Sequence, residues 1–194
     1  MRKLTCLTLA ALAAAAVTAG TSLASPHAGG AVVKVYMSAK MVPNHYFQEG
    51  MRFSPGTITV TSGETLTFTY GDKEMEPHTL TIVPRSALPR TAAEAENCSV
   101  CERFATPHLK NPKAPPGDSN PIVHWVLDKG APGLDTVGDS VAIQPGPHKS
   151  ITVTVSAPAG TTLYFVCAVH PWMQGKIVVR SPGGAASTDS ARPL

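Results

Sequence analysis

The residues best suited to chemistry stand close together near the end of the chain. Cys167, His170 and Met173 follow one another at the spacing C-x-x-H-x-x-M, between two apolar runs rich in β-branched residues. A thiolate, an imidazole and a thioether form a soft ligand set, which favours copper over magnesium, calcium or manganese. A trigonal site of two His and one Cys with a weak axial Met carries single electrons, so the spacing predicts such a centre and requires one more imidazole.

The best candidate for that imidazole is His78, which begins the β-like run His78–Val83. Taken singly, the four residues have ordinary interpretations: a buried free cysteine, loop histidines and a methionine that fills the core. Their joint spacing, with a strand expected on each side of the loop, favours metal ligation instead. The competing histidines are His27, His45, His108, His124 and His148. His45 lies in a polar loop and His148 in a turn, so we expect neither at the ligand end of the fold.

The segment YFVCAVHPWMQGKIVV, residues 164–179, resembles the C-terminal ligand loop of the cupredoxins, most closely that of the amicyanins and plastocyanin-like members. The segment Thr57–Val83 resembles the part of that fold that provides the first histidine. The match covers residues 55–83 and 141–180. It implies an all-β, cupredoxin-like Greek-key β-sandwich that holds one type 1 copper ion. The ligands that the resemblance implies are His78, Cys167, His170 and Met173.

The resemblance has one local departure and one large one. Many cupredoxins have Asn directly after the first histidine, where this chain has Thr79. The resemblance therefore does not extend to the usual hydrogen bond that ties the two ligand loops together and tunes the potential. Residues 84–140 do not fit the short amicyanin pattern at all, and we expect them to form a long, irregular and partly helical insertion.

Strand patterns dominate the rest of the chain. In Glu64–Tyr70, apolar and threonine side chains alternate with the period of two that marks a half-buried strand. Many short strands separated by Gly and Pro predict two packed sheets, whose end loops suit a metal site. The expected strands are Ala31–Ser38, Thr57–Thr61, Glu64–Tyr70, His78–Val83, Ile122–Leu127, Val141–Gln144, Lys149–Ser156, Thr161–Cys167 and Lys176–Arg180.

Within the insertion, Thr91 and Glu94 form a capping-box pattern that predicts a helix over residues 92–104. Cys98 and Cys101 would then stand three residues apart. A local disulfide is the first interpretation of this pair, and it requires the helix to break there because the two Cβ atoms must converge. The alternatives are a second metal site completed by His108 or His124, and a working thiol–disulfide centre.

The first 24 residues have the pattern of a secretory signal peptide: a basic start at Arg2 and Lys3, an apolar run, and the small-residue site Ser22-Leu23-Ala24. The expected domain is then residues 25–180, followed by a disordered tail at 181–194, with no transmembrane segment in the mature chain. Removing Arg2 and Lys3 from the 16 basic residues leaves 14 against 13 acidic ones, and this balance gives no reason to expect nucleic acid. An exported protein fits an oxidising periplasm, cell envelope or exterior, where a disulfide persists.

The function expected from these residues is that of an exported, monomeric blue-copper protein that cycles between Cu(II) and Cu(I). Its partners would be redox proteins such as a cytochrome c, a dehydrogenase or an oxidase. An enzyme is disfavoured because the chain lacks H-x-H pairs for further copper centres and a second cysteine in the ligand loop. The alternative is a copper-binding or delivery protein, which the scattered Met37, Met41, Met51 and Met75 favour. Trp172 has two interpretations: an apolar rim beside His170, or a cap on the core.

Overall fold

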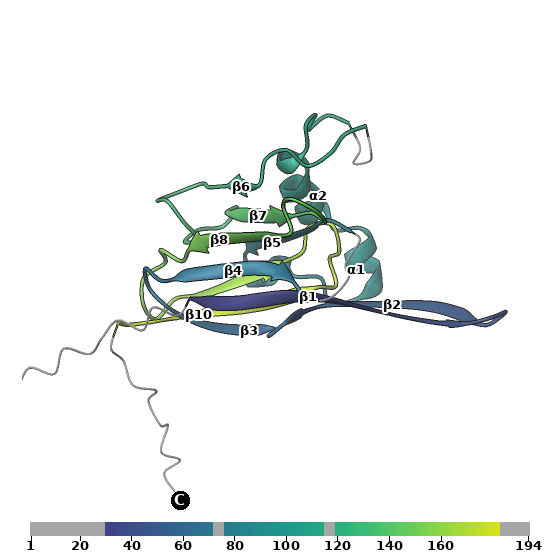
Figure 1. Ribbon diagram of the computed structural model, residues 1–194, viewed down its shortest axis with the longest axis horizontal. Helices are drawn as coiled ribbons and strands as arrows, with labels where there is room; N and C mark the ends of the chain where they lie inside the picture. Colours follow the sequence, from purple (N-terminus) through teal and green to yellow (C-terminus); the bar gives the residue numbers. More distant parts are fainter. Residues whose placement is uncertain (1–29, 72–75, 115–118, 183–194) are drawn as a thin grey trace, which may run out of the picture.

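The computed structural model describes residues 30–71, 76–114 and 119–182, and these form two packed β-sheets with a partly helical insertion (Figure 1). The expected signal peptide, Met75 and the expected tail from residue 183 lie outside the described residues. The strands are β1 Ala31–Val42, β2 Tyr46–Ser54, β3 Thr57–Thr61, β4 Thr65–Tyr70, β5 His78–Val83, β6 Val126–Leu127, β7 Ser140–Ile143, β8 Ser150–Thr154, β9 Thr162–Val166 and β10 Gln174–Arg180. The helices are η1 Arg85–Ala87, α1 Ala92–Glu96, α2 Ser99–Ala105 and η2 Thr106–His108.

The first sheet has the strand order β2-β1-β4-β8, and the second has the order β3-β10-β9-β5-β7-β6. The chain crosses between the two layers after β2, β3, β4, β7 and β8, and it stays in one layer elsewhere. The predicted all-β Greek-key sandwich is confirmed. Apolar side chains from both sheets, including Phe68 and Phe165, meet in one continuous core between the layers.

The strands β5 and β7 are buried on both faces, although a sandwich covers only one. One face carries Leu80 and Val141, which belong to the core between the sheets. The insertion covers the other face: Cys101 packs there beside Val83, and Leu109 packs beside Ala142. The insertion therefore covers the outer face of the second sheet, and Figure 1 shows its helix α2 next to β7 and β5.

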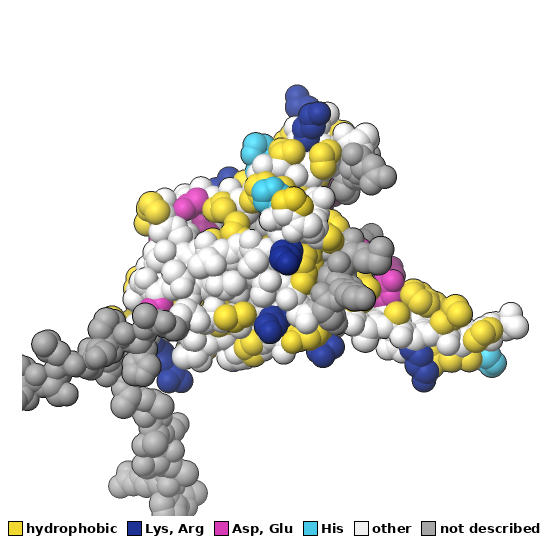
Figure 2. Space-filling model, viewed as in Figure 1, with side chains coloured by type: hydrophobic (Ala, Val, Ile, Leu, Met, Phe, Trp, Pro, Cys, Tyr) yellow, Lys and Arg dark blue, Asp and Glu magenta, His cyan; other side chains and the backbone are white. Residues whose placement is uncertain are grey.

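The sequence missed two features of the strands. Residues 46–54 form β2, which pairs along its whole length with β1, so the two strands run out of the sandwich as a long hairpin (Figure 1). Apolar side chains lie exposed along this arm (Figure 2), among them Met41 and Phe47. The strand expected at Ile122–Leu127 is reduced to β6 and an isolated bridge between Leu109 and Ile122.

None of the helices in the described part of the chain has the length and hydropathy of a transmembrane span.

Candidate metal centre

Two loops at one end of the second sheet bring His78, Cys167 and His170 together. His78 begins β5, Cys167 directly follows β9, and His170 lies in the loop between β9 and β10. The Cys167 Sγ atom is 3.6 Å from His78 Nδ1 and 3.7 Å from His170 Nδ1, and the two Nδ1 atoms are 3.1 Å apart. This is the only cluster of three or more His, Cys, Asp or Glu side chains with such spacing among the residues described.

These separations fit a single metal ion. Metal–nitrogen bonds of about 2.0 Å and metal–sulfur bonds of about 2.3 Å, as in zinc sites, place ligand atoms roughly 3.3–3.7 Å apart at tetrahedral or trigonal angles. The 3.1 Å between the two Nδ1 atoms is only slightly shorter. All three side chains are buried, and His170 at 8% exposure is the most accessible of them. A site made of two imidazoles and one thiolate favours copper or zinc over magnesium, calcium or manganese.

The surroundings of both histidine rings favour a nitrogen lone pair that is directed at a metal ion. Burial, and to a lesser extent the neighbouring His170, lower the pKa of His78 to about 3, so its ring is neutral at ordinary pH. His170 Nε2 is 2.8 Å from a carboxylate oxygen of Glu76. A carboxylate only accepts hydrogen bonds, so Glu76 fixes the proton of the ring on Nε2. This leaves Nδ1 of His170 free to bind a metal. Glu76 was not anticipated from the sequence, although it stands only two residues before His78.

Cys167 is fully buried, as is His78. Burial raises the pKa of Cys167, and this is opposed by hydrogen bonds that include one from the backbone N–H of Thr79, at 3.4 Å. A thiol in so apolar a place keeps its proton unless a cation replaces it. Metal binding would therefore release that proton and stabilise the thiolate.

The loop that carries His170 and Met173 is a tight, internally bonded turn. His170 N–H donates to the Cys167 carbonyl, Met173 N–H donates to the His170 carbonyl, and Cys167 N–H donates to the Met173 carbonyl. Met173 is 1% exposed and packs in the same core cluster as Cys167. The structure thus places Met173 close to the cluster in the fold, and its role as axial ligand stays a prediction.

Thr79 ties the two ligand loops together, a role that was not predicted for it. Its hydroxyl oxygen accepts a hydrogen bond of 2.7 Å from the Ala168 N–H, while its own N–H donates to Cys167 Sγ. A threonine can therefore link the loops in place of the asparagine found in many cupredoxins. The link adds bonding around the sulfur, which is one of the ways a protein tunes a copper site.

The competing histidines lie elsewhere. His45 is in the turn between β1 and β2, and the ring of His148 stacks on Trp125 with centroids 3.9 Å apart. His108 is fully buried within the insertion, where it contacts Ser140 and the carbonyl of His124. His27 lies outside the described residues. None of the four described alternatives belongs to the cluster.

Cys98 and Cys101 form a disulfide, the first of the three interpretations. The expected helix is broken there into α1 and α2, and Cys98 becomes the N-cap of α2. Thr91 caps α1 as predicted, because its side chain accepts from the N–H of Glu94. Cys101 packs beside Ala168, so the disulfide supports the ligand loop. Because both cysteines are in the disulfide, neither offers a thiol to a second metal ion.

Replacing both Cys98 and Cys101 by Ser should lower the free energy of unfolding and leave the metal spectrum unchanged, because neither residue is near enough to ligate. The cost should fall at the lower end of the ~0–5 kcal/mol range of disulfides, since the closed loop is short. Denaturant unfolding and the visible spectrum of the copper-loaded variant measure both quantities. A changed spectrum with an unchanged free energy of unfolding would contradict a purely structural role of the disulfide.

Trp172 lies at the surface of the ligand loop and does not cap the core. Its side chain is 51% exposed, and its ring meets the His170 ring edge-on at a centroid distance of 5.3 Å. Val169 and Pro171 are half-buried beside it. Of the two interpretations of Trp172, the apolar rim beside His170 is the one that this placement supports.

No protein-family model and no curated protein matches this chain. Solved structures with a similar fold include Auracyanin A, a "blue" copper protein from Chloroflexus aurantiacus, at 21% identity and a TM-score of 0.39 over 78% of this chain and 100% of that one. A purple cupredoxin from Nitrosopumilus maritimus matches at 13% identity and a TM-score of 0.38 over 77% and 98%. The Cu(I) form of an amicyanin mutant matches at 16% and 0.36 over 78% and 83%.

The two packed sheets of the structure agree with the sandwich that the resemblance of the ligand loop implied. Likenesses this distant carry no argument about the site. What the site can do rests on the contacts of His78, Cys167 and His170 themselves.

Proposed function

We propose that this protein is an exported blue-copper carrier that transfers one electron at a time between redox proteins. The observation that supports this most is the buried cluster of His78, Cys167 and His170, whose three ligand atoms converge on one point. Met173 would be the weak axial ligand. A bound copper ion would supply the chemistry by alternating between Cu(II) and Cu(I).

The surrounding residues suit this role because they hold the ligands still. His78 and Cys167 are anchored by β5 and β9, which lie side by side in one sheet. Three backbone hydrogen bonds close the loop that holds His170, and Glu76 fixes the orientation of its ring. Ligands that move little when the charge changes make electron transfer fast, since little reorganisation accompanies each step.

His170 is the expected point of electron entry and exit, because it is the only one of the three clustered side chains that reaches the surface. Trp172, Val169 and Pro171 surround it with apolar area. Interfaces of transient electron-transfer complexes are small, below ~1,200 Å² of buried surface, so they need only a limited apolar patch. Suitable partners are a cytochrome c, a dehydrogenase or an oxidase.

No catalytic activity is proposed. Three strong ligands and Met173 would leave no open coordination position, and an open position is what a catalytic metal keeps for substrate. Two of the methionines that favoured a delivery protein, Met37 and Met51, face each other across β1 and β2 and pack at the core, which is an ordinary structural role. Met41 is exposed further along the hairpin arm.

Repeated redox cycling separates a shuttle from a delivery protein. The copper-loaded protein should pass through many rounds of oxidation by ferricyanide and reduction by ascorbate in the presence of a Cu(I) chelator, and should keep its copper. Rapid loss of copper to the chelator during the first reduction would contradict the shuttle and favour delivery.

Trp172→Glu should slow electron exchange with a protein partner while the visible spectrum and the copper affinity persist, because it places a charge on the rim without touching a ligand. Stopped-flow kinetics with a cytochrome c measure the effect. Val137→Glu is the matched control: Val137 is 47% exposed and precedes Ser140, at the opposite end of β7 from the residue that pairs with His78. Equal rates for the wild type and Trp172→Glu would remove Trp172 from the docking rim.

A further inference from the structure

The hairpin arm of β1 and β2 leaves the sandwich at the end that holds the metal cluster. β1 runs parallel to β4, and the last pair between them joins Val35 to Tyr70. Tyr70 ends β4 at the metal site: its hydroxyl donates to the Glu76 carbonyl, and its ring lies 6.0 Å from the His78 ring between centroids. Beyond Val35, β1 therefore passes the metal end, and among the described strands it pairs there with β2 alone (Figure 1).

This free part of the hairpin is long and regular. Residues 36–42 of β1 pair with residues 46–52 of β2 in one unbroken register, and the His45 N–H donates to the Val42 carbonyl to close the turn. At about 3.3 Å per residue, the free strands reach roughly 23 Å beyond the sandwich. A ribbon of two strands is only marginally stable by itself in water, so a contact with another surface would stabilise the arm.

One face of the arm continues the outer surface of the first sheet, and its large side chains pair with each other. The Arg52 guanidinium carbon lies 5.2 Å from the ring centroid of Tyr36, and Lys40 Nζ lies 5.7 Å from that of Tyr46. Such cation–π contacts stabilise this outer face without any further partner.

The other face of the arm, its inner face, continues the hydrophobic core. Side chains alternate along a strand, so this face holds Met37, Ala39 and Met41 of β1 and, opposite them, Met51, Glu49 and Phe47 of β2. Met37 and Met51 still pack at the core, but Met41 is 69% exposed and Phe47 is 62% exposed (Figure 2). Two large apolar side chains paired in solvent are typical of an interaction surface.

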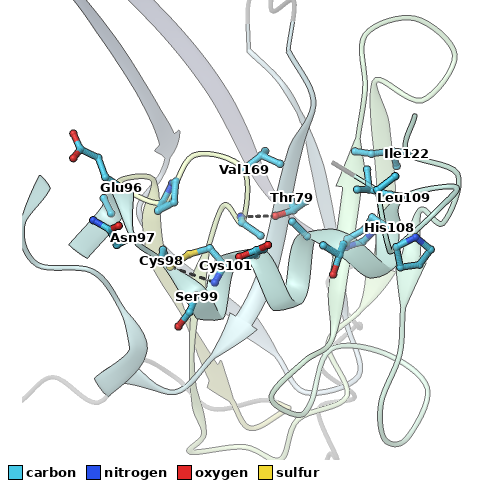
Figure 3. A pocket seen from close by; sticks show the side chains of 18 of the residues that line it. Thr79, Glu96, Asn97, Cys98, Ser99, Cys101, His108, Leu109, Ile122 and Val169 are labelled. Atoms are coloured by element: carbon cyan, nitrogen blue, oxygen red, sulfur yellow. Dashed lines mark hydrogen bonds between the residues drawn. A yellow bond between two sulfur atoms is a disulfide. The ribbon is translucent and has the colours of Figure 1, made fainter. Parts of the chain in front are cut away.

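The inner face of the arm stands beside the ligand loop. The core face of the first sheet is turned toward the second sheet, which packs about 10 Å away and carries the ligand loop at its end. β2 lies against β10, and β10 begins at Gln174, directly after the ligand loop. On its other side the loop borders a hollow that the insertion lines, with Val169 in its wall (Figure 3). The loop therefore lies between the arm and the insertion.

The exposed area decides against a second copy of the chain as the partner of the arm. Of the ~150–250 Å² of a large aromatic side chain, roughly 125 Å² of Phe47 is open, and Met41 opens a similar area. Two copies that met through these side chains would bury roughly 500 Å², below the ~1,200 Å² or more of stable interfaces. Trp172 adds roughly 125 Å². Arm and ligand loop together would bury roughly 800 Å² over both proteins, which suits a transient electron-transfer complex.

The charges beside this apolar area decide between a protein and a lipid surface. Glu49 is the one charged side chain on the inner face of the arm, and the Glu76 carboxylate stands beside His170. Anionic lipid headgroups repel carboxylates and attract lysine and arginine, but Lys40 and Arg52 belong to the outer face. Carboxylates instead attract a protein with basic side chains.

We propose that the inner face of the arm and the apolar rim beside His170 form one docking surface for a redox protein. The face through which that partner exposes its cofactor would be apolar at the centre and basic at the edge. The proposal rests on the proposed electron-transfer function and names the chemistry of its partner. The ligand loop provides the point of electron exchange, and the arm adds the contact area that the rim lacks.

Phe47→Ser tests the arm without touching a ligand. In stopped-flow reactions of the copper-loaded protein with mitochondrial cytochrome c, a basic redox protein, it should lower the second-order rate constant about tenfold. Val32→Ser is the matched control, because Val32 is 44% exposed on the part of β1 that pairs with β4 inside the sandwich. Both variants should react with hexaammineruthenium at the wild-type rate, since so small a complex reaches His170 without the arm. An unchanged cytochrome rate in Phe47→Ser would overturn the proposal.

Glu49→Lys tests the charge of the partner. It should slow the reaction with cytochrome c at low salt, and its difference from the wild type should shrink as the salt concentration rises, because salt screens exposed charges. A faster reaction in Glu49→Lys would contradict a basic partner.

Direct binding measurements test the two other occupants of the inner face. Sedimentation velocity should find a monomer, and vesicles of phosphatidylglycerol should leave the protein in the supernatant. A dimer that Phe47→Ser dissociates would assign the inner face to a second copy and overturn the proposal. Vesicle binding that the same variant abolishes would assign it to a lipid surface and overturn the proposal as well.

An NMR titration of the metal-free protein with reduced cytochrome c separates this proposal from the proposed function. The amide signals of Met41 and Phe47 should shift together with that of Trp172, and the amide of Val32 should not. These shifts in a protein that forms no coloured copper site would uphold the docking surface and sink the proposed function. A coloured, redox-active site without any shift on the arm would overturn the docking surface and leave the proposed function intact.

Discussion

Cys167→Ser should abolish the intense visible absorption of the copper-loaded protein. The band requires a short bond between a thiolate and Cu(II), and Cys167 is the only free cysteine among the described residues. Serine is nearly isosteric but offers a hard oxygen with a far higher pKa, so it cannot replace the thiolate as a ligand. Absorption spectroscopy on protein titrated with Cu(II) measures the loss directly.

The double variant Cys98→Ser and Cys101→Ser is the control for this experiment. It removes two sulfurs from the same protein, both of which are joined in a disulfide outside the cluster. It should remain as coloured as the wild type. A visible band that survives Cys167→Ser would place the copper on other ligands and would refute the assignment of the centre.

The second large effect is expected at the imidazoles. His78→Ala and His170→Ala should each weaken copper binding by more than about 100-fold or open a position that external ligands enter, since even residues behind the ligands contribute 10–100-fold in such sites. His78 should be the more damaging loss, because it is 0% exposed and water does not readily replace its nitrogen. Competition with a chelator of known affinity gives the constants.

His45→Ala and His148→Ala serve as controls that remove an imidazole elsewhere. His45 lies in the hairpin turn and His148 stacks on Trp125, so both variants should bind copper as the wild type does. If His124→Ala destroyed the site while His78→Ala did not, the histidine from β5 would not be a ligand.

The sequence predicted the sandwich because its strands carry their own signals. In β4, Leu66 and Phe68 are buried and alternate with threonines that are less so, which is the pattern that period-two reasoning detects. The ligand loop was likewise readable because Cys167, His170 and Met173 lie within one short segment. The hairpin arm was missed because residues 46–49 are exposed on both faces of the strand, and only Met51 and Phe53 show the alternation of a half-buried strand.

The contacts around the centre were not readable, because they join residues distant in sequence. Thr79 and Ala168 are 89 residues apart, and His170 and Glu76 are 94 apart. Thr79, Thr81 and Ser140 looked like ordinary strand residues. These residues are buried only because the insertion folds over β5 and β7. No local pattern in the sequence of the insertion predicts which part of the sheet it covers.

The visible and EPR spectra of the copper-loaded wild-type protein test the central claim most directly. If His78, Cys167 and His170 hold Cu(II), the protein should show an intense thiolate-to-copper band in the visible. Its EPR signal should show a reduced copper hyperfine splitting, because the unpaired electron is shared with the Cys167 sulfur. A colourless protein with fully bound Cu(II) would contradict the account.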